Sequence, residues 1–238
     1  MKFLNFFIFL TLVLFSSNDS KAQKNNATIE NALLIAKQNK NNLENVQQLL
    51  VVFNYQPENY TASFVALEKK GTGYNVKLGP VEVGIGKNGF ALPFHKKEGD
   101  GKSPTGIFRL GKLFSYEKQF ETLLENQQTT AEDKWIDDPN SKDYNTYIKG
   151  ATNAKTYENL VLNNDAYKYC IVIEYNTNPI VKGKGSAIFL HLAIKKPSFT
   201  AGCVAIDEVR MNSLVNWLDP KQNPTIIMGN LNVLKNGF

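Results

Sequence analysis

The feature that most constrains the fold is a series of short apolar runs, rich in β-branched and aromatic residues and separated by glycine and proline. These runs lie at residues 49–53, 64–67, 74–78, 81–85, 169–175, 187–194 and 225–228. Runs of this kind are typical of β-strands, and the pair Gly79 and Pro80 between two of them is typical of a turn. Residues 207–218 instead carry apolar side chains at helical spacing, after a cap at Asp207. The sequence therefore predicts a mainly β fold with a few helices, in which residues 48–232 form one domain.

The middle of the chain is less regular. Residues 112–165 are rich in Asp, Asn, Tyr and Thr, and we expect a long functional loop region with room for a short helix. We expect Trp135, Asp137, Asp138 and Tyr144 to pack and cap this loop region. Asp137 and Asp138 are adjacent carboxylates in a turn, and such carboxylates are usually solvated. A share in ligand binding is the alternative for these residues.

The composition excludes several classes of function. The chain has 238 residues, with 27 Lys and Arg, 22 Asp and Glu, two His and two Cys. Two cysteines exclude a disulfide-rich scaffold and a four-cysteine zinc site, and two histidines argue against a histidine-based metal centre. The net charge of +5 is spread along the chain without a dense basic run, so nucleic-acid binding is not expected. No metal or organic cofactor is implied.

The N-terminus has the pattern of a secretory signal peptide. Lys2 precedes an almost wholly apolar stretch at residues 3–15, and Ser20 and Ala22 fit the small-residue positions of a cleavage site after Ala22. The stretch is shorter than the roughly 20 residues that span a bilayer, and no cysteine is available for a lipid anchor. We therefore expect residues 1–22 to be removed. The mature protein would be exported, periplasmic or cell-wall associated, and without a stable membrane anchor.

A polar, Asn-rich leader follows the predicted cleavage site. Residues 23–47 contain one short apolar pattern, at residues 29–36, that is compatible with a short helix. We expect this leader to pack loosely on the domain.

His191 and Cys203 are the residues with the clearest chemical potential. His191 interrupts an otherwise apolar strand, where a buried imidazole needs a hydrogen-bond partner. Cys203 follows Gly202 shortly before the predicted helix, whose N-terminus would favour a thiolate. A neighbouring histidine can accept the thiol proton, and backbone N–H groups near the cysteine can form an oxyanion hole. On spacing alone, a structural cysteine and a satisfied core histidine explain the pattern equally well.

Two segments together resemble a known family. The sequence GSAIFLH at residues 185–191, followed by TAGCVA at residues 200–205, is similar to the catalytic motif of the YkuD-type L,D-transpeptidase family. The block KEGDGKSPTGIF at residues 97–108 resembles an upstream segment of the same family. The resemblance covers roughly residues 48–230. It implies a β-sandwich-like fold with Cys203 as nucleophile and His191 as base.

The resemblance also implies a substrate and a reaction. Cys203 would attack the third residue of a peptidoglycan tetrapeptide stem, release D-Ala and pass the acyl group to an amine. Gly202, Thr200 and Val204 would serve as oxyanion and positioning elements. An L,D-carboxypeptidase or wall hydrolase that uses water as acceptor, and a non-catalytic cell-wall binding module, are the alternatives. Leu192, Ala201 and Ala205, at positions where many members carry Gly, His and Arg or Asn, indicate a divergent branch.

The remaining candidates have structural explanations beside the functional ones. Asp100, Lys102 and Thr105 lie in the Gly-rich block, which is rich in turn-forming residues and would border the cleft if the resemblance holds. His95 is expected to be a solvated loop residue or a second cleft-lining group. Cys170 is expected to be a buried, inert thiol, with a disulfide to Cys203 as the rival interpretation.

Overall fold

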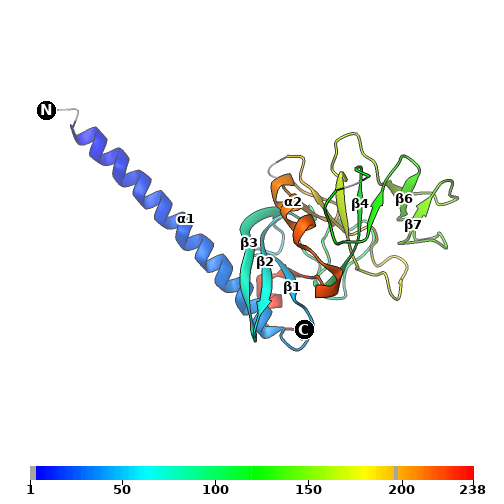
Figure 1. The fold of residues 1–238 in the computed structure, drawn as a ribbon, viewed down its shortest axis with the longest axis horizontal. Coiled ribbons are helices and arrows are strands. Elements are labelled where there is room, and N and C mark those ends of the chain that lie inside the picture. Colours follow the sequence, from blue (N-terminus) through cyan, green and yellow to red (C-terminus); the bar gives the residue numbers. More distant parts are fainter. Residues whose placement is uncertain (1–3, 119, 196–197) are drawn as a thin grey trace.

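A computed structural model describes residues 4–118, 120–195 and 198–238. Eight strands of the main sheet close into a mixed barrel in the order β12-β1-β2-β3-β11-β10-β9-β4, because β4 also pairs with β12 (Figure 1). These strands are β1 (Gln48–Asn54), β2 (Thr61–Lys70), β3 (Gly73–Gly84), β4 (Gly106–Ser115), β9 (Tyr169–Ile173), β10 (Phe189–Leu192), β11 (Val204–Ile206) and β12 (Thr225–Asn230). The prediction of a mainly β fold with a few helices is confirmed. The pairing of β4 with β12 makes the sheet a closed barrel where sandwich-like packing was expected.

Strand β1 is buried on both faces, which explains its unbroken apolar sequence. Leu50 and Val52 point into the barrel, whereas Leu49, Val51 and Phe53 pack outward against helices. The outward cluster is completed by residues of α1 (Leu4–Gln38), of the segment that follows it and of α3 (Leu231–Leu234), namely Ala32, Ile35, Ala36, Leu43, Val46, Leu231 and Leu234. The prediction that residues 23–47 pack loosely is therefore wrong for the second half of this segment.

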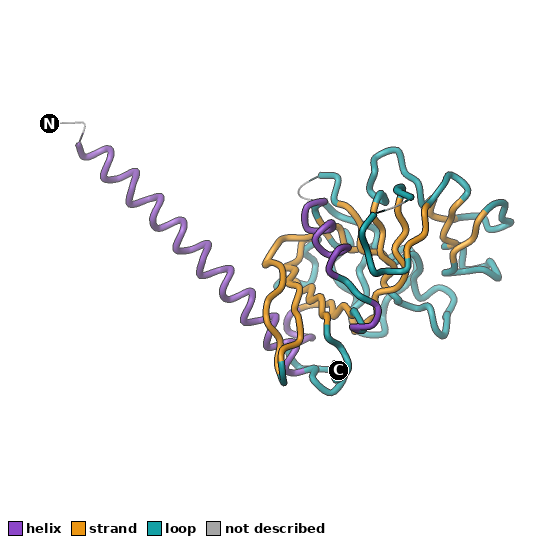
Figure 2. The backbone as a smooth tube through the Cα atoms, in the orientation of Figure 1, coloured by secondary structure: helices purple, strands orange, loops and turns teal. Residues whose placement is uncertain are grey.

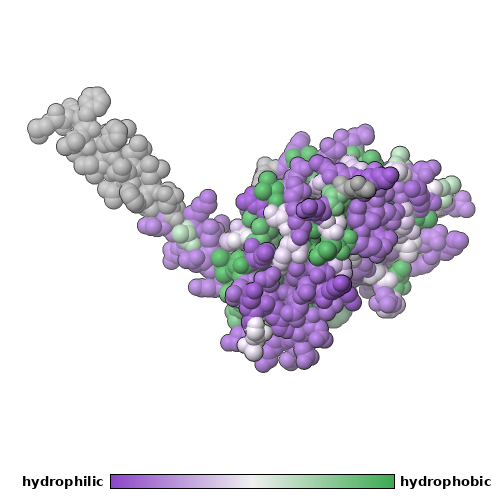
Figure 3. All heavy atoms as spheres, viewed as in Figure 1, coloured by the Kyte–Doolittle hydropathy of each residue, from purple (hydrophilic) through white to green (hydrophobic). Residues whose placement is uncertain are grey.

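Helix α1 extends well beyond the barrel, as Figure 1 shows, and its C-terminal end contacts β1, β2, β3 and α3. Residues 19–27 of this helix are exposed, so the predicted cleavage site after Ala22 lies on an accessible stretch. Among the described residues, none of the helices combines the length and apolarity needed to cross a bilayer. Hydrophilic residues cover most of the visible face of the body (Figure 3).

Strand β3 runs through Gly79 and Pro80, where the sequence predicted a turn between two strands. Its partner β2 shifts register at Phe64 to Ala66, so the ladder bends and continues instead of reversing. Gly79 has φ +100°, and a Cβ there would lie 2.7 Å from the carbonyl oxygen of Phe64. Only glycine fits this bulge, so the residue that suggests a turn in the sequence shapes a bend within one strand.

The region 112–165 contains more strand structure than its sequence predicted. After the end of β4 it forms β5 (Asn126–Gln128), which joins the edge of β4, and a separate sheet of order β7-β6-β8. The strands of this small sheet are β6 (Asp133–Ile136), β7 (Tyr147–Lys149) and β8 (Tyr157–Asn159). Its Trp135 packs edge-on against Phe189 of β10 at 5.3 Å between ring centroids. The small sheet therefore packs against the outer face of β10. It lies on the side of the body away from α1 (Figure 2).

Helix α2 (Glu208–Trp217) follows β11 directly and confirms the helix predicted at residues 207–218. Asp207 is its N-cap, and the Asp207 carboxylate accepts the backbone N–H of Arg210. Met211, Leu214 and Val215 join the cluster inside the barrel. The short 3-10 helix Pro220–Gln222 then leads into β12.

Candidate active site

The pairing of β10 with β11 brings His191 and Cys203 to the same face. The strands are parallel, with Leu190 opposite Val204 and His191 opposite Ala205. Side chains alternate along a strand, so Cys203, two residues before Ala205, points to the side on which His191 lies. This side is the outer face of the barrel, under the small sheet. The alternate residues of both strands point into the barrel interior.

The Cys203 thiol is buried and held by the backbone of β10. Its Sγ donates to the carbonyl oxygen of Ala187 at 3.2 Å and accepts the N–H of Phe189 at 3.3 Å. Burial raises the pKa of Cys203 to about 12, against the lowering effects of the Phe189 N–H and the Lys96 charge. The negative charge of Glu158 raises the pKa further. The thiolate expected from the nearby helix N-terminus is therefore not the resting form of this residue.

The His191 imidazole is also buried, with 8% of the residue exposed. Its Nδ1 lies 3.0 Å from the carbonyl oxygen of Leu192, which can only accept, so Nδ1 carries a proton. The other nitrogen, Nε2, forms no hydrogen bond within the described residues and is free to accept a proton. Burial lowers the pKa of His191 to about 4, although the bond to Leu192 raises it. At neutral pH the site thus holds a neutral imidazole and a neutral thiol.

Thr200 and Ser103 fix the turn that presents Cys203. The Thr200 hydroxyl donates to the carbonyl oxygen of Cys203 at 2.8 Å and accepts the N–H of Gly202 at 3.1 Å. From the Gly-rich block, the fully buried Ser103 donates to the carbonyl oxygen of Gly202 at 2.7 Å and accepts the N–H of Gly86. Because the Gly202 N–H is already engaged, an oxyanion role for Gly202 requires the substrate oxygen to replace the Thr200 hydroxyl.

The close packing around residue 202 leaves room only for glycine. A Cβ at this position would lie 2.9 Å from the carbonyl oxygen of Lys102 and 3.2 Å from Cδ1 of Ile188. The Gly-rich block therefore packs directly against the cysteine turn, although about 100 residues separate the two segments in the chain.

Cys203 and His191 line one cavity of about 230 Å³, which we call the thiol cavity. Thr200 and Gly202 also line it, together with the neighbouring Phe199 and Ala201. The Tyr167 ring forms a further wall and contacts the His191 ring edge-on at 5.2 Å between centroids.

Five of the predicted site residues do not line this cavity. Val204 is fully buried inside the barrel. His95 is exposed, and its Nδ1 bonds to the carbonyl oxygen of Pro93. Asp100 and Lys102 bond to each other within the Gly-rich loop, and Thr105 borders a separate groove. His95 is thus the solvated loop residue that was one of its two expected roles, and Asp100 and Lys102 shape the turn of the Gly-rich block. The alternative, that these residues and Thr105 line the cleft, does not hold for the thiol cavity, because the loop presents other residues there.

Four further charged residues, from the loop and from the region of the small sheet, face the cavity: Lys96, Glu98, Asp137 and Glu158. The sequence analysis missed Lys96, Glu98 and Glu158, and gave ligand binding only as the alternative for Asp137. Asp137 was expected to be solvated in its turn, but the small sheet brings it and Glu158 over the outer face of β10. The only signal in the sequence was the acidic character of the middle region, which does not show which carboxylates converge.

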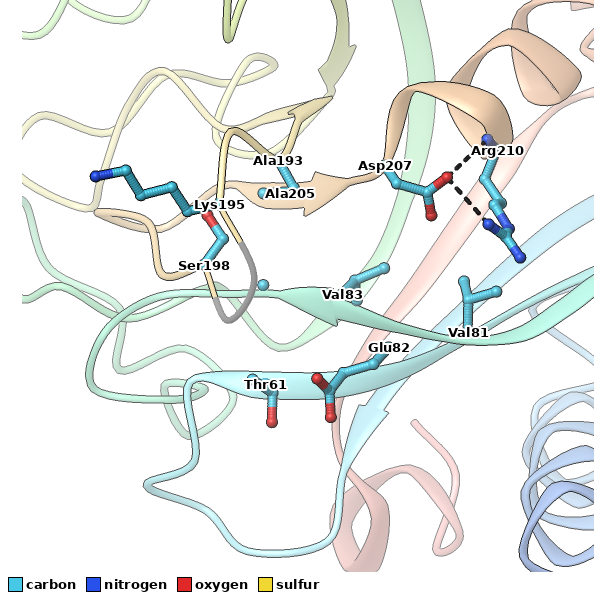
Figure 4. A pocket seen from close by; sticks show the side chains of 11 residues that line it. Thr61, Val81, Glu82, Val83, Ala193, Lys195, Ser198, Ala205, Asp207 and Arg210 are labelled. Carbon is cyan, nitrogen blue, oxygen red and sulfur yellow. Dashed lines mark hydrogen bonds and ion pairs between the residues drawn. The ribbon is translucent and has the colours of Figure 1, made fainter. Parts of the chain in front are cut away.

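A second cavity, of about 220 Å³, borders Ala205, the residue opposite His191, and lies against β3 and the start of α2 (Figure 4). The small side chains of Ala193 and Ala205 border it, and Figure 4 shows Asp207 bonded to Arg210 at its edge. Its described lining residues include neither a cysteine nor a histidine. Cys203 and His191 therefore line the thiol cavity and not this one.

Cys170 is a free, fully buried thiol in β9. It lies opposite His191 in the antiparallel pair of β9 and β10, with β10 between it and Cys203. Burial raises its pKa well above the usual value, as expected for an inert thiol.

Comparison with protein families agrees with this geometry. The family model for the L,D-transpeptidase catalytic domain, YkuD, matches residues 51–227. Comparison with curated proteins and with solved structures found no match. The matched range runs from β1 to β12 and includes the Gly-rich block, His191 and Cys203. The chain therefore belongs to the YkuD family of L,D-transpeptidase catalytic domains.

Proposed function

We propose that the protein is an exported cysteine acyl transferase that acts on peptidoglycan stem peptides, with Cys203 as nucleophile and His191 as base. The observation that carries this proposal is that both side chains lie on one face of β10 and β11 and line one buried cavity. Export rests on the predicted signal peptide at residues 1–22. The substrate class rests on the family to which the chain belongs.

The first half-reaction forms a thioester. As Sγ of Cys203 attacks the carbonyl carbon of the third stem residue, Nε2 of His191 accepts the thiol proton. The S–C bond forms, the C–N bond to D-Ala breaks, and Nε2 returns the proton to the departing amine. The bond from Nδ1 to the Leu192 carbonyl oxygen holds the tautomer that leaves Nε2 free for this task.

The second half-reaction releases the acyl group. An acceptor amine attacks the thioester carbon, the new C–N bond forms, and the C–S bond breaks. The proton lost by the amine returns through His191 to the Cys203 sulfur. The resting pair is neutral, so the histidine acts as a general base during attack and not as the partner of a preformed thiolate.

The test is to incubate the protein with disaccharide-tetrapeptide muropeptides and identify the products by mass spectrometry. We expect cross-linked dimers with loss of D-Ala, and a loss of activity of about 10³-fold or more in Cys203→Ala. Cys170→Ala is the matched control, because this equally buried thiol does not line the cavity, and it should retain activity.

The other outcomes identify the alternatives. Tripeptide as the sole product would show that water is the acceptor and that the protein is an L,D-carboxypeptidase. Unchanged substrate in both samples, with intact sacculi also unchanged, would contradict the enzymatic proposal and favour a cell-wall binding module.

A further inference from the structure

The backbone carbonyl that holds the Cys203 thiol depends on an unusual conformation at Ala187. The φ angle of Ala187 is +52°, in the left-handed region, which residues other than glycine rarely adopt because Cβ crowds the backbone there. The carbonyl oxygen of Ala187 accepts Sγ of Cys203 at 3.2 Å. A change of Ala187 to the ordinary region would redirect this carbonyl. The position of Sγ therefore depends on a conformation that alanine does not favour by itself.

Asn145, in the loop between β6 and β7, stabilises this conformation. Its Oδ1 accepts the N–H of Ala187 at 3.1 Å and Nε1 of Trp135 at 2.8 Å. Strained backbone conformations persist where the surrounding contacts over-determine them. The bond from Ala187 to Asn145 is such a contact, because it fixes the peptide group that precedes Ala187.

The Asn145 side chain is itself firmly held. Asn145 is 3% exposed and has φ +56°, a value that asparagine adopts more readily than most residues. Its Nδ2 donates to the carbonyl oxygens of Asn176 at 2.7 Å and Tyr175 at 3.2 Å. With the two bonds to Oδ1, the amide makes the four hydrogen bonds that an asparagine side chain can make. These bonds fix the direction in which Oδ1 points.

The residue next to Asn145 supports the same segment of the chain. The hydroxyl of Tyr144, which is almost fully buried, accepts the N–H of Gly185 at 3.0 Å. Two successive residues of one loop thus bind two N–H groups of the segment 185–187. This segment leads directly into β10, and the loop of the small sheet fixes its course.

We propose that Asn145 is a positioning residue of the active site, which holds Ala187 in the left-handed conformation and thereby places Sγ of Cys203. Asn145 does not line the thiol cavity, so it acts on Cys203 through Ala187. The inference rests on the proposed function and deepens it, because it assigns a residue outside the cavity wall to the placing of the nucleophile.

The first test reads the Cys203 thiol without any substrate. The chain has two cysteines, so Cys170→Ala leaves a single S–H group. The infrared stretching band of a thiol moves to lower frequency when the thiol donates a hydrogen bond. We expect a lowered band in this parent protein and the higher band of an unbonded thiol after Asn145→Gly. Glycine tolerates φ +56°, so this variant removes the side chain without straining residue 145.

A second-site change separates positioning from general stabilisation. Glycine adopts the left-handed region without steric cost, so Ala187→Gly removes the strain that the bond to Asn145 offsets. We expect Ala187→Gly to return the S–H band of Asn145→Gly toward its position in the parent. A merely structural role of Asn145 predicts no recovery, because an added glycine increases the freedom of the unfolded chain.

Kinetics measure the effect on the reaction. We expect Asn145→Gly to slow thioester formation about 100-fold at saturating tetrapeptide donor, which is the usual effect of displacing a reacting atom by about 1 Å. The donor concentration for half-maximal rate should stay within about twofold, because Asn145 does not line the cavity. Adding Ala187→Gly should restore about tenfold of the rate, the factor that corresponds to the strain of alanine in the left-handed region.

The matched control is a buried asparagine elsewhere in the fold. Asn39, at the contact between α1 and α3, is 1% exposed, and its Nδ2 also donates to two backbone carbonyls, those of Ile35 and Leu234. We expect Asn39→Gly to lower the thermal unfolding temperature and to leave both the S–H band and the rate of thioester formation unchanged.

A second variant keeps the test decisive if Asn145→Gly does not fold. Asn145→Asp retains an accepting oxygen for Ala187 and loses the two donors to the residues at 175 and 176. We expect it to lower stability and to keep the S–H band at the low frequency of the parent. A band at the unbonded position in folded Asn145→Asp would contradict the proposal.

The remaining outcomes distinguish this proposal from the proposed reaction. An S–H band that stays at low frequency in folded Asn145→Gly would overturn the positioning role, whatever the activity. A shifted band that Ala187→Gly does not restore, or a shifted band with an unchanged rate of thioester formation, would overturn it as well. If the wild type forms no thioester while the band responds as expected, the proposed reaction is refuted and the placing of Sγ by Asn145 is supported.

Discussion

At the scale of single residues, His191 shows how burial determines chemistry. Burial lowers its pKa to about 4, so Nε2 can accept a proton throughout the neutral range. We predict that the rate of thioester formation falls as the pH decreases through about 4 and is independent of His191 ionisation above about pH 5.5. Single-turnover measurement of the acyl-enzyme between pH 3.5 and 8, by intact-protein mass spectrometry, checks this prediction. An acidic limb near the ordinary histidine value of about 6.5 would contradict it.

The same ionisation affects stability. The folded chain leaves His191 neutral, whereas the unfolded chain protonates it below its ordinary pKa of about 6.5. The free energy of unfolding therefore decreases as the pH falls from about 6.5 to about 4, because the unfolded state binds one more proton. Below that window the loss no longer grows. Urea unfolding of wild type and His191→Asn provides the control, since the variant should lose less stability across this interval.

At the scale of elements, the end of α1 is part of the core. Ile35 is fully buried against β1 and α3, whereas Leu34, next to it on the same helix, is 36% exposed. We predict that Ile35→Ala lowers the free energy of unfolding by about 2–4 kcal/mol and that Leu34→Ala costs less than about 1 kcal/mol. Urea denaturation measures both. Equal, small effects would restore the interpretation of residues 23–47 as a loosely packed leader.

At the scale of the whole molecule, the strand order keeps the two thiols apart. Cys170 in β9 and Cys203 before β11 are separated by β10, which places their backbones roughly 10 Å apart. A disulfide requires Cα atoms within about 7 Å, so the rival disulfide cannot form without moving a strand. We predict two free thiols per chain when the protein is denatured without reductant and titrated with a thiol reagent. Cys170→Ala should give one, and a wild-type mass lowered by two hydrogens would refute this arrangement.

Much of this structure follows from local sequence patterns. The apolar runs at β1, β9, β10 and β12 identify strands because short continuous runs of β-branched and aromatic residues, bounded by turn residues, are typical of buried strands. The helical spacing of apolar residues before Leu218 and the cap at Asp207 identify α2, because both signals depend only on neighbouring residues. The motif around Cys203 and the position of His191 in a buried run identified these two residues as candidates, although the sequence alone does not show that they line one cavity.

The sequence by itself determined the strands, α2 and the chemical types at residues 191 and 203, since each depends on neighbouring residues. Tertiary structure decided the barrel closure by β4 and β12, the burial of Ile35, the bend at Gly79 and the contact of Ser103 with Gly202. It also decided which carboxylates line the thiol cavity, because the small sheet sets the positions of Asp137 and Glu158. These features join segments far apart in the chain, and no local periodicity records which distant partner a side chain meets.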